Sequence, residues 1–177
     1  MNKHLFLALC MLLSFSFTHA QITEFKKGWT TELRLQSGMA TNFEGNSPDM
    51  FTGGLLLTEH VTAVPGKLKA GAVAGGIYYN KKLQGLFGPE VLFKIKDFSA
   101  GEMGSIGNLH LSANWLFGTE HEQLVGGGIH VSALNLLTIG LTAHRDYNLN
   151  SWWFQCVVSV RLSKVKKAPE PFNEGPK

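Results

Sequence analysis

Apolar and polar residues alternate with a period of two along most of the chain beyond residue 28. In the segment "LHLSANWLF" (109–117), Leu, Leu, Ala, Trp and Phe occupy the odd positions, and His, Ser, Asn and Leu occupy the even ones. This alternation is typical of a β-strand with one apolar and one polar face. We therefore predict a strand here, whose polar face carries no charge.

The same alternation recurs in seven further segments that are separated by turn-like sequences. The eight predicted strands cover residues 29–39, 51–61, 67–79, 86–96, 109–117, 124–133, 136–144 and 152–162. The facing of 67–79 stays ambiguous because small residues dominate it. Segments of about ten alternating residues between turns are the sequence signature of a membrane-spanning β-barrel.

The composition of the polar face indicates which side of the sheet meets water. A solvated face is normally dense in Lys and Glu, whereas this one is mostly Gly, Ser, Thr, Asn, Gln and His, and charged residues are only 16% of the chain. Small hydrogen-bonding residues suit the crowded interior of an eight-stranded barrel. We therefore predict that His110, Ser112 and Asn114 point into the lumen and that the apolar face contacts lipid.

Aromatic residues gather at the ends of the predicted strands. The set far from the termini comprises Phe51, Phe87, Trp115, Phe117 and Trp152. Trp29, helped by Phe25, marks the near side. Such positions are typical of the interfacial girdles of a membrane barrel. The alternative is that they are core aromatics of a soluble, lipocalin-like periplasmic carrier.

Residues 1–20 have the pattern of a secretory signal peptide. Lys3 and His4 precede an apolar run of thirteen residues, and the small residue Ala20 ends the segment. We expect cleavage after Ala20. Loss of Lys3 would leave 15 Lys and Arg against 13 Asp and Glu, so the net charge falls from +3 to +2. Cys156 would then be the single cysteine, which excludes an intrachain disulfide.

The flanks of the strand region are predicted to lie in the periplasm. Residues 21–28 form an N-terminal segment. Residues 163–177, "SKVKKAPEPFNEGPK", are basic and broken by proline, so we predict a disordered tail.

Together, the signal peptide, the eight strands and their alternation resemble those of the small outer-membrane β-barrel superfamily of Gram-negative bacteria. The resemblance covers about residues 29–162 and rests on no diagnostic motif. It implies an all-β fold, a closed eight-stranded antiparallel up-and-down transmembrane β-barrel in the outer membrane. Closure is needed because hydrocarbon tolerates no unpaired sheet edge. One departure is the end of the barrel, where such proteins often finish at an aromatic residue but Leu162 is followed by a tail.

Charged and histidine side chains share the predicted inward face. The expected interior network comprises Glu32, Arg34, Glu90, Lys94, His110, His130 and Arg161, with Lys96, His60 and His144 on the same face. An ion path is one interpretation of these charges. We favour a lumen filled by salt bridges, because a water-filled channel usually needs about twice as many strands.

Two pairings follow from the predicted register. A turn centred on Glu120 would place His110 opposite His130. Two histidines could begin a metal site, but no ligand spacing supports one, so we expect a hydrogen-bonded pair, no metal and no cofactor. Pairing of the first and last strands would make Glu32 and Arg161 neighbours.

The sequence favours a structural or surface-interaction protein without enzymatic activity, surrounded by outer-membrane lipid and monomeric. The net charge gives no case for nucleic acid. A partner protein would meet the "TNFEGNSPDM" loop (41–50). The alternative is a lipid-modifying acyl hydrolase or transferase using outward Ser37 and Glu59, although no nucleophile-elbow motif occurs. We expect Glu59 and Arg145 to lie near strand ends at the lipid headgroups.

Overall fold

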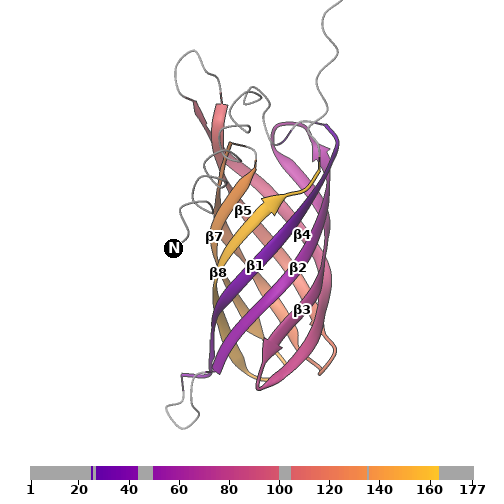
Figure 1. Ribbon diagram of the computed structural model, residues 1–177, viewed down its shortest axis with the longest axis vertical. Helices are drawn as coiled ribbons and strands as arrows, with labels where there is room; N and C mark the ends of the chain where they lie inside the picture. The colour runs from indigo at the N-terminus through magenta and orange to yellow at the C-terminus, as the bar shows by residue number, and fades with distance from the viewer. Residues whose placement is uncertain (1–24, 26, 44–49, 100–104, 135, 164–177) are drawn as a thin grey trace, which may run out of the picture.

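The computed structural model describes residues 25, 27–43, 50–99, 105–134 and 136–163, which form a closed barrel of eight strands (Figure 1). Every strand pairs antiparallel with the next, and β1 pairs with β8. The strands are β1 Trp29–Thr41, β2 Met50–Val64, β3 Leu68–Tyr79, β4 Lys82–Ser99, β5 Ser105–Gly118, β6 Gln123–Ala133, β7 Leu137–Asp146 and β8 Ser151–Arg161. The predicted closed, eight-stranded antiparallel fold is therefore confirmed. No helix in this described part of the chain is long and apolar enough to span a membrane.

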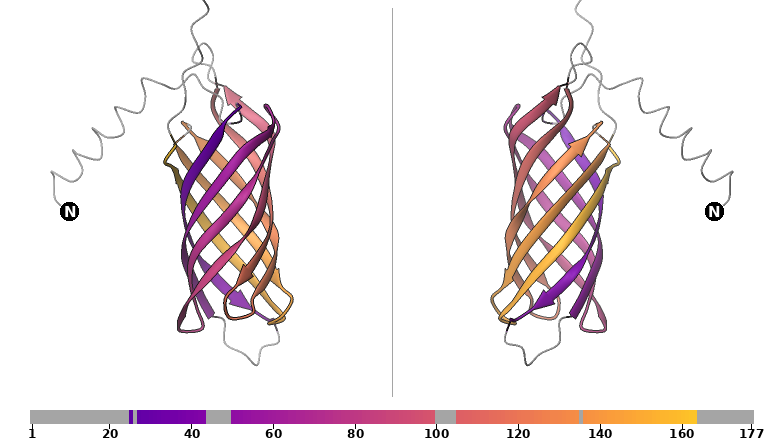
Figure 2. Two further views of the ribbon diagram at one scale, coloured as in Figure 1. Left: turned by 90° about the vertical axis from the view of Figure 1, so that its right-hand side faces the viewer. Right: turned by 90° about the vertical axis from the view of Figure 1, so that its left-hand side faces the viewer.

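The described segment begins and finishes at the same end of the barrel, because the number of strands is even (Figure 2). We call this the terminal end and the opposite one the far end. Short turns close the far end between β3 and β4, where Asn80 and Lys81 have φ of 47° and 62°. Two successive positive φ angles are the geometry of a tight type I′ hairpin turn, whose twist matches that of the flanking strands.

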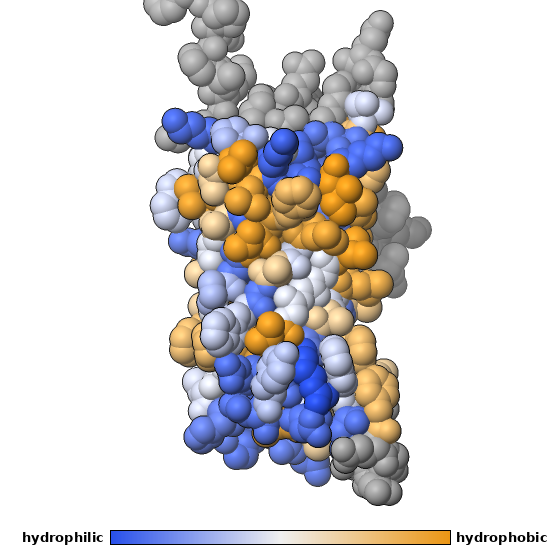
Figure 3. All heavy atoms as spheres, turned by 180° about the vertical axis from the view of Figure 1, so that it is seen from behind, coloured by the Kyte–Doolittle hydropathy of each residue, from blue (hydrophilic) through white to orange (hydrophobic). Residues whose placement is uncertain are grey.

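Burial alternates along the strands, so the inward and outward faces are distinct. Most outward positions are aliphatic or aromatic, and several are more than half exposed, as Ile129, Ile139 and Leu141 are. On the face drawn in Figure 3 these side chains form an apolar zone that is widest in the half nearer the terminal end. The predicted inward parity of the polar residues is confirmed for most strands.

Strand β3 has a definite facing despite its small residues. Lys69, Val73 and Ile77 are buried in the lumen, whereas Ala72 and Ala74 face outward. A Cβ added at the inward Gly71 would overlap the backbone oxygen of Glu59 on β2. Glycine is therefore required there because the two backbones approach each other too closely for a side chain.

The predicted inward position of Lys96 is wrong. The register between β4 and β5 shifts between Lys94, which pairs with His110, and Lys96, which pairs with Leu109. Such a bulge inserts one extra residue into a strand and reverses the facing of the residues beyond it. Lys96 is consequently exposed on the outside of the barrel.

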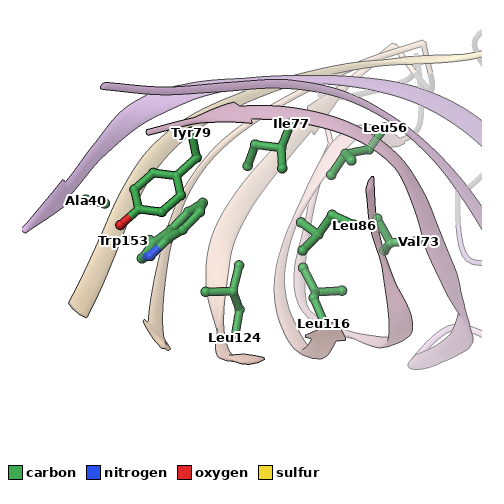
Figure 4. Packing of buried hydrophobic residues seen from close by; sticks show 9 residues of the cluster. All are labelled: Ala40, Leu56, Val73, Ile77, Tyr79, Leu86, Leu116, Leu124 and Trp153. Carbon is green, nitrogen blue, oxygen red and sulfur yellow. The ribbon is translucent and has the colours of Figure 1, made fainter. Parts of the chain in front are cut away.

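Apolar side chains also fill part of the lumen, which the sequence interpretation did not expect. This apolar cluster comprises Ala40, Leu56, Val73, Ile77, Tyr79, Leu86, Leu116, Leu124 and Trp153 (Figure 4). Most of its members lie on the parts of the strands that run toward the far end. The prediction of a lumen filled by polar side chains is therefore incomplete: buried polar residues extend to the far end, as Thr52 and Asp146 show, but the apolar cluster lies among them.

Candidate functional site

A bidentate ion pair crosses the lumen between β1 and β4. Arg34 donates from Nη1 to Glu90 Oε1 and from Nη2 to Glu90 Oε2, each over 2.8 Å. Both side chains are almost completely buried. Paired guanidinium–carboxylate bonds are among the strongest polar contacts in proteins. This pair therefore ties two strands that share no ladder.

Glu90 also joins three other strands through a chain of hydrogen bonds. His60 Nε2 lies 2.9 Å from Glu90 Oε2 and must donate, because a carboxylate only accepts. Asn114 donates to Glu90 Oε1 over 3.1 Å and accepts from His144 Nε2 over 2.8 Å. We call Arg34, Glu90, His60, Asn114 and His144 the Glu90 network. It links β1, β2, β4, β5 and β7, and the sequence did not place Glu90 near any histidine.

His110 and His130 lie opposite each other on β5 and β6, as predicted. Their rings stack with centroids 5.3 Å apart. Each ring bonds elsewhere: His130 Nε2 lies 2.9 Å from Ser112 Oγ, and His110 Nδ1 lies 2.9 Å from Asn108 Oδ1. Among the residues that the structure describes, no group of three or more potential metal ligands is found.

The register that closes the barrel pairs Glu32 with Arg161, which confirms the predicted neighbourhood of the two charges. Ser159 donates to Glu32 Oε2 over 3.1 Å, and Arg161 Nη2 donates to Thr30 Oγ1 over 3.4 Å. Glu32 is buried, and Arg161 is half-buried near the terminal rim.

Phe25 closes the mouth of the lumen at the terminal end. Its side chain is 1% exposed, and its backbone oxygen accepts a 2.8 Å hydrogen bond from Gly66 N. The ammonium groups of Lys69 and Lys94 lie 4.8 and 5.8 Å from its ring centroid, and the His110 ring lies 5.8 Å away. Placing Phe25 in an aromatic girdle is therefore wrong: its ring packs on cations inside the barrel.

Lys94 is consequently part of the mouth of the lumen, where most of its side chain is buried. Its ammonium group also pairs with Asp97 over 2.6 Å. The predicted interior position of Lys94 is confirmed, and its partner is a residue on the same strand.

The far end is closed by aromatic packing. The Tyr79 and Trp153 rings lie 4.5 Å apart, and Trp153 Nε1 donates to Ser151 Oγ over 3.0 Å. Beside them, Asp146 Oδ1 accepts the backbone N–H groups of Asn148 and Leu149 at 3.0 and 3.1 Å. These two bonds fix the β7–β8 turn.

A sequence signal for the apolar cluster was present but was not used. Leu116 occupies an even, polar-parity position in "LHLSANWLF", and Trp153 has the opposite parity to Trp152. Leu56, Leu86 and Leu124 break the alternation of their strands in the same way. Because every one of these exceptions lies in the lumen, they could have indicated an apolar layer there.

The outward aromatics of the far end lie where the sequence placed them. Phe51, Phe87, Trp115 and Trp152 are exposed, and Phe117 is half-buried. The Arg145 guanidinium lies 5.4 Å from the Trp152 ring centroid and also bonds Asn150. Trp29, 70% exposed, marks the terminal rim. The barrel therefore has aromatic side chains near both ends of its outer surface.

The two candidate catalytic residues are not brought together. Ser37 pairs with Gly53 of β2, whereas Glu59 lies six positions farther along that strand. At a rise of about 3.4 Å per residue, six positions correspond to roughly 20 Å. A nucleophile and a carboxylate at that separation cannot exchange a proton through one histidine.

Comparison with known proteins identifies no family. No protein-family model matches the chain, and no curated protein matches it. A solved structure titled "De novo design of transmembrane beta-barrels" is similar at 11% identity and a TM-score of 0.47. The alignment covers 75% of this chain and 95% of that one.

Proposed function

We propose that the chain is an integral outer-membrane protein of a Gram-negative bacterium, with a closed lumen and a structural or surface-interaction role. The observation that carries this proposal is the distribution of side chains, which is the reverse of that in a soluble barrel. Large apolar side chains lie outside, and a buried ionic network lies inside. We further propose that it is a monomer and has no enzymatic activity.

The outer surface of the barrel supports the membrane location. Soluble monomers rarely expose contiguous apolar patches larger than a few hundred Å². Here every strand contributes, for example Leu35, Leu55, Tyr78, Phe93, Leu111, Ile129, Leu141 and Val158. Residues distributed over all eight strands make a belt around the barrel, and a belt is what a bilayer covers.

The packing of the lumen favours a closed barrel and argues against an open pore. Phe25 fills the terminal mouth, the Glu90 network crosses the middle, and Trp153 with Tyr79 fills the far end. An ion would have to displace all three. The charges of the lumen are therefore better explained as structural ion pairs than as a conduction path.

The observations also bear on the two alternatives. A soluble carrier would present polar residues outside, and the exposed aliphatic residues of β7 and β8 argue against it. For a lipid-modifying enzyme, the separation of Ser37 from Glu59 removes the one pair that the sequence offered.

The experiment combines fractionation with electrophoresis and conductance. We expect the protein to stay with carbonate-washed membranes and to migrate differently on a detergent gel before and after boiling. In planar bilayers it should give no steady conductance. Release by carbonate without detergent would contradict the membrane proposal, and stable open channels would contradict the closed lumen. Altered lipid A or phospholipid masses on deletion would favour the enzyme.

The proposed surface for a partner protein is the loop at residues 41–50. Residues 44–49 lie outside the described part of the chain, and at the edge of the loop the Phe43 ring lies 6.1 Å from that of Phe154. Replacing 44–49 by a short glycine–serine linker should preserve heat-modifiable migration. Loss of cell-surface binding in this variant would support the proposal, and full retention would contradict it.

A further inference from the structure

We infer that the terminal end of the barrel binds the headgroups of anionic phospholipids through Lys27, Lys67 and Lys96. This inference rests on the proposed membrane location and names the lipid class that contacts one rim. All three lysines are exposed on the outside of the barrel. We call them the lysine rim.

Backbone hydrogen bonds bring the three lysines to one sector of the rim. Gly66 N donates to Phe25 O over 2.8 Å, and Thr62 N donates to Gly28 O over 3.1 Å, so the segment with Lys27 lies beside the β2–β3 turn. Lys94 N donates to Lys67 O over 2.8 Å, which places Lys67 next to β4. The β4 bulge then turns Lys96 outward in the same sector.

The lysine rim adjoins the edge of the apolar surface. Trp29 and Val61 pair across β1 and β2 just below it, and both are exposed. On β4, Phe93 and Ile95 lie three positions and one position before Lys96, and both are about half exposed. Long lysine side chains beside such residues place their ammonium groups at the headgroup level of a bilayer. The site is therefore positioned for lipid phosphate.

The balance of charge differs between the two rims. Counted over buried and exposed described residues alike, the far end has the cations Lys81, Lys82 and Arg145 and the anions Glu120, Glu122 and Asp146, of which the last two are buried. Counted in the same way, the terminal end has the cations Lys27, Lys67, Lys69, Lys94, Lys96 and Arg161 against Glu32 and Asp97, and Asp97 is bound to Lys94. Glu59 is exposed on β2 but lies three positions farther from the rim than Thr62. Within the part of the chain that the structure describes, the terminal end is thus the more cationic one.

The expected occupant is a phosphodiester headgroup that carries net negative charge, such as that of phosphatidylglycerol. A lysine near an anionic bilayer surface contributes about fivefold to association, and salt screens that contribution. A zwitterionic headgroup offers the same phosphate with a compensating cation, so the lysines should discriminate against it.

The test uses residues 21–177, which is the chain without the predicted signal peptide. The protein is inserted into vesicles of phosphatidylcholine alone or of phosphatidylcholine mixed with phosphatidylglycerol. Spin-labelled lipids of each headgroup report the fraction immobilised by the protein. We compare wild type with the variant Lys27→Gln/Lys67→Gln/Lys96→Gln and with the control Lys81→Gln/Lys82→Gln at the balanced far rim. The exterior location of these residues leaves the Glu90 network intact in both variants.

We expect wild type and the control to select phosphatidylglycerol over phosphatidylcholine by about fivefold at low salt, with the preference lost at high salt. The rim variant should show a ratio near one. The lysine rim would be contradicted as a lipid site if wild type immobilised the two lipids equally. It would also be contradicted if the rim variant kept the wild-type preference for phosphatidylglycerol. Added inorganic phosphate at constant ionic strength should not abolish selection, and if it does, the site binds free anions instead of lipid.

Insertion into pure phosphatidylcholine, read from heat-modifiable migration, separates this inference from the proposed function. Insertion without headgroup preference would overturn the lysine rim alone. Failure to insert into either vesicle would contradict the membrane location and the lipid site together.

Discussion

The Glu90 network and the apolar cluster are held together by different interactions, although both lie on the inward face of the strands. In the Glu90 network, which crosses the middle of the lumen, Arg34 and Glu90 make directional bonds that each require a partner. In the apolar cluster, Trp153 and Ile77 are equally buried but contribute apolar contact. A buried charge that loses its partner keeps its desolvation cost, whereas a packed apolar side chain leaves only a cavity.

The outside of the barrel changes at a similar level. Around the stacked histidines His110 and His130 the outward residues of β6, β7 and β8 are aliphatic, as Ile129, Ile139 and Val158 are. Around the apolar cluster they include Phe87 and Trp115, which pack against Phe117. Aliphatic side chains suit the hydrocarbon and aromatic ones suit the interface. Under the proposed membrane location, the Glu90 network would therefore lie at the level of the hydrocarbon.

The largest expected effect comes from removing the carboxylate at the centre of the Glu90 network. Glu90→Leu leaves Arg34 buried without its carboxylate and should lower the free energy of unfolding by about 3–5 kcal/mol. The double variant Arg34→Leu/Glu90→Leu should recover much of that loss. Urea titration in detergent measures both. The control is Glu120→Gln, which removes an exposed pair with Lys82 and should cost less than about 1 kcal/mol.

If the double variant were as unstable as the single one, the ion pair would not be the source of the loss. The stability of this part of the lumen would then depend on the shape of the two side chains.

Removing a large side chain from the apolar cluster should lower the free energy of unfolding somewhat less. Trp153→Ala empties part of the cluster and should reduce the free energy of unfolding by about 3 kcal/mol. The neighbouring Trp152→Ala is the matched control, because that ring faces outward. In bilayers it should change stability much less. Equal losses in the two variants would mean that the facing of β8 is wrong.

Several features of the structure could be predicted from the sequence alone. The period-two pattern and the turns were sufficient for the eight strands, the pairing of His110 with His130, and the neighbourhood of Glu32 and Arg161. The pairing of His110 with His130 depends on register, and register within a hairpin follows from alternation and turn length. The neighbourhood of Glu32 and Arg161 depends in addition on closure of the barrel, which was expected because hydrocarbon tolerates no unpaired sheet edge.

Contacts across the lumen could not be predicted in this way. Arg34 and Glu90 are 56 residues apart and lie on strands that do not pair, so only closure and tilt bring them together. The facing of Lys96 depends on a bulge, which alternation does not reveal. Phe25 precedes the first strand, and its position depends on two lysines from β3 and β4.

A smaller effect is expected at the seam that closes the barrel. Arg161→Leu should destabilise the barrel, and adding Glu32→Leu should restore much of the loss. Because Arg161 is only half-buried near the rim, we expect a coupling energy of about 1 kcal/mol. A double-mutant cycle of unfolding in detergent gives this quantity. Purely additive losses would show that the paired register does not bring the two charges into contact.

The smallest effect concerns the closure at the terminal mouth. Phe25→Ala removes the ring from Lys69 and Lys94 and should cost about 1 kcal/mol. It should also speed hydrogen exchange of amides around His110, which Phe25 covers. Phe25→Leu should retain the cover but lose the cation–π contribution. Unchanged exchange in Phe25→Ala would mean that the mouth is closed by something else.

The reactivity of Cys156 tests most directly the claim that the outer face meets hydrocarbon. Cys156 is exposed on the outside of β8, paired with Ser37 and Leu141 within the apolar surface. With purified membranes open on both sides, we predict that a charged, water-soluble maleimide labels Cys156 only after denaturation in detergent. A Cys156→Ser/Thr119→Cys variant, with its thiol in the exposed β5–β6 turn, should label at once. Rapid labelling of native Cys156 in membranes would contradict the account.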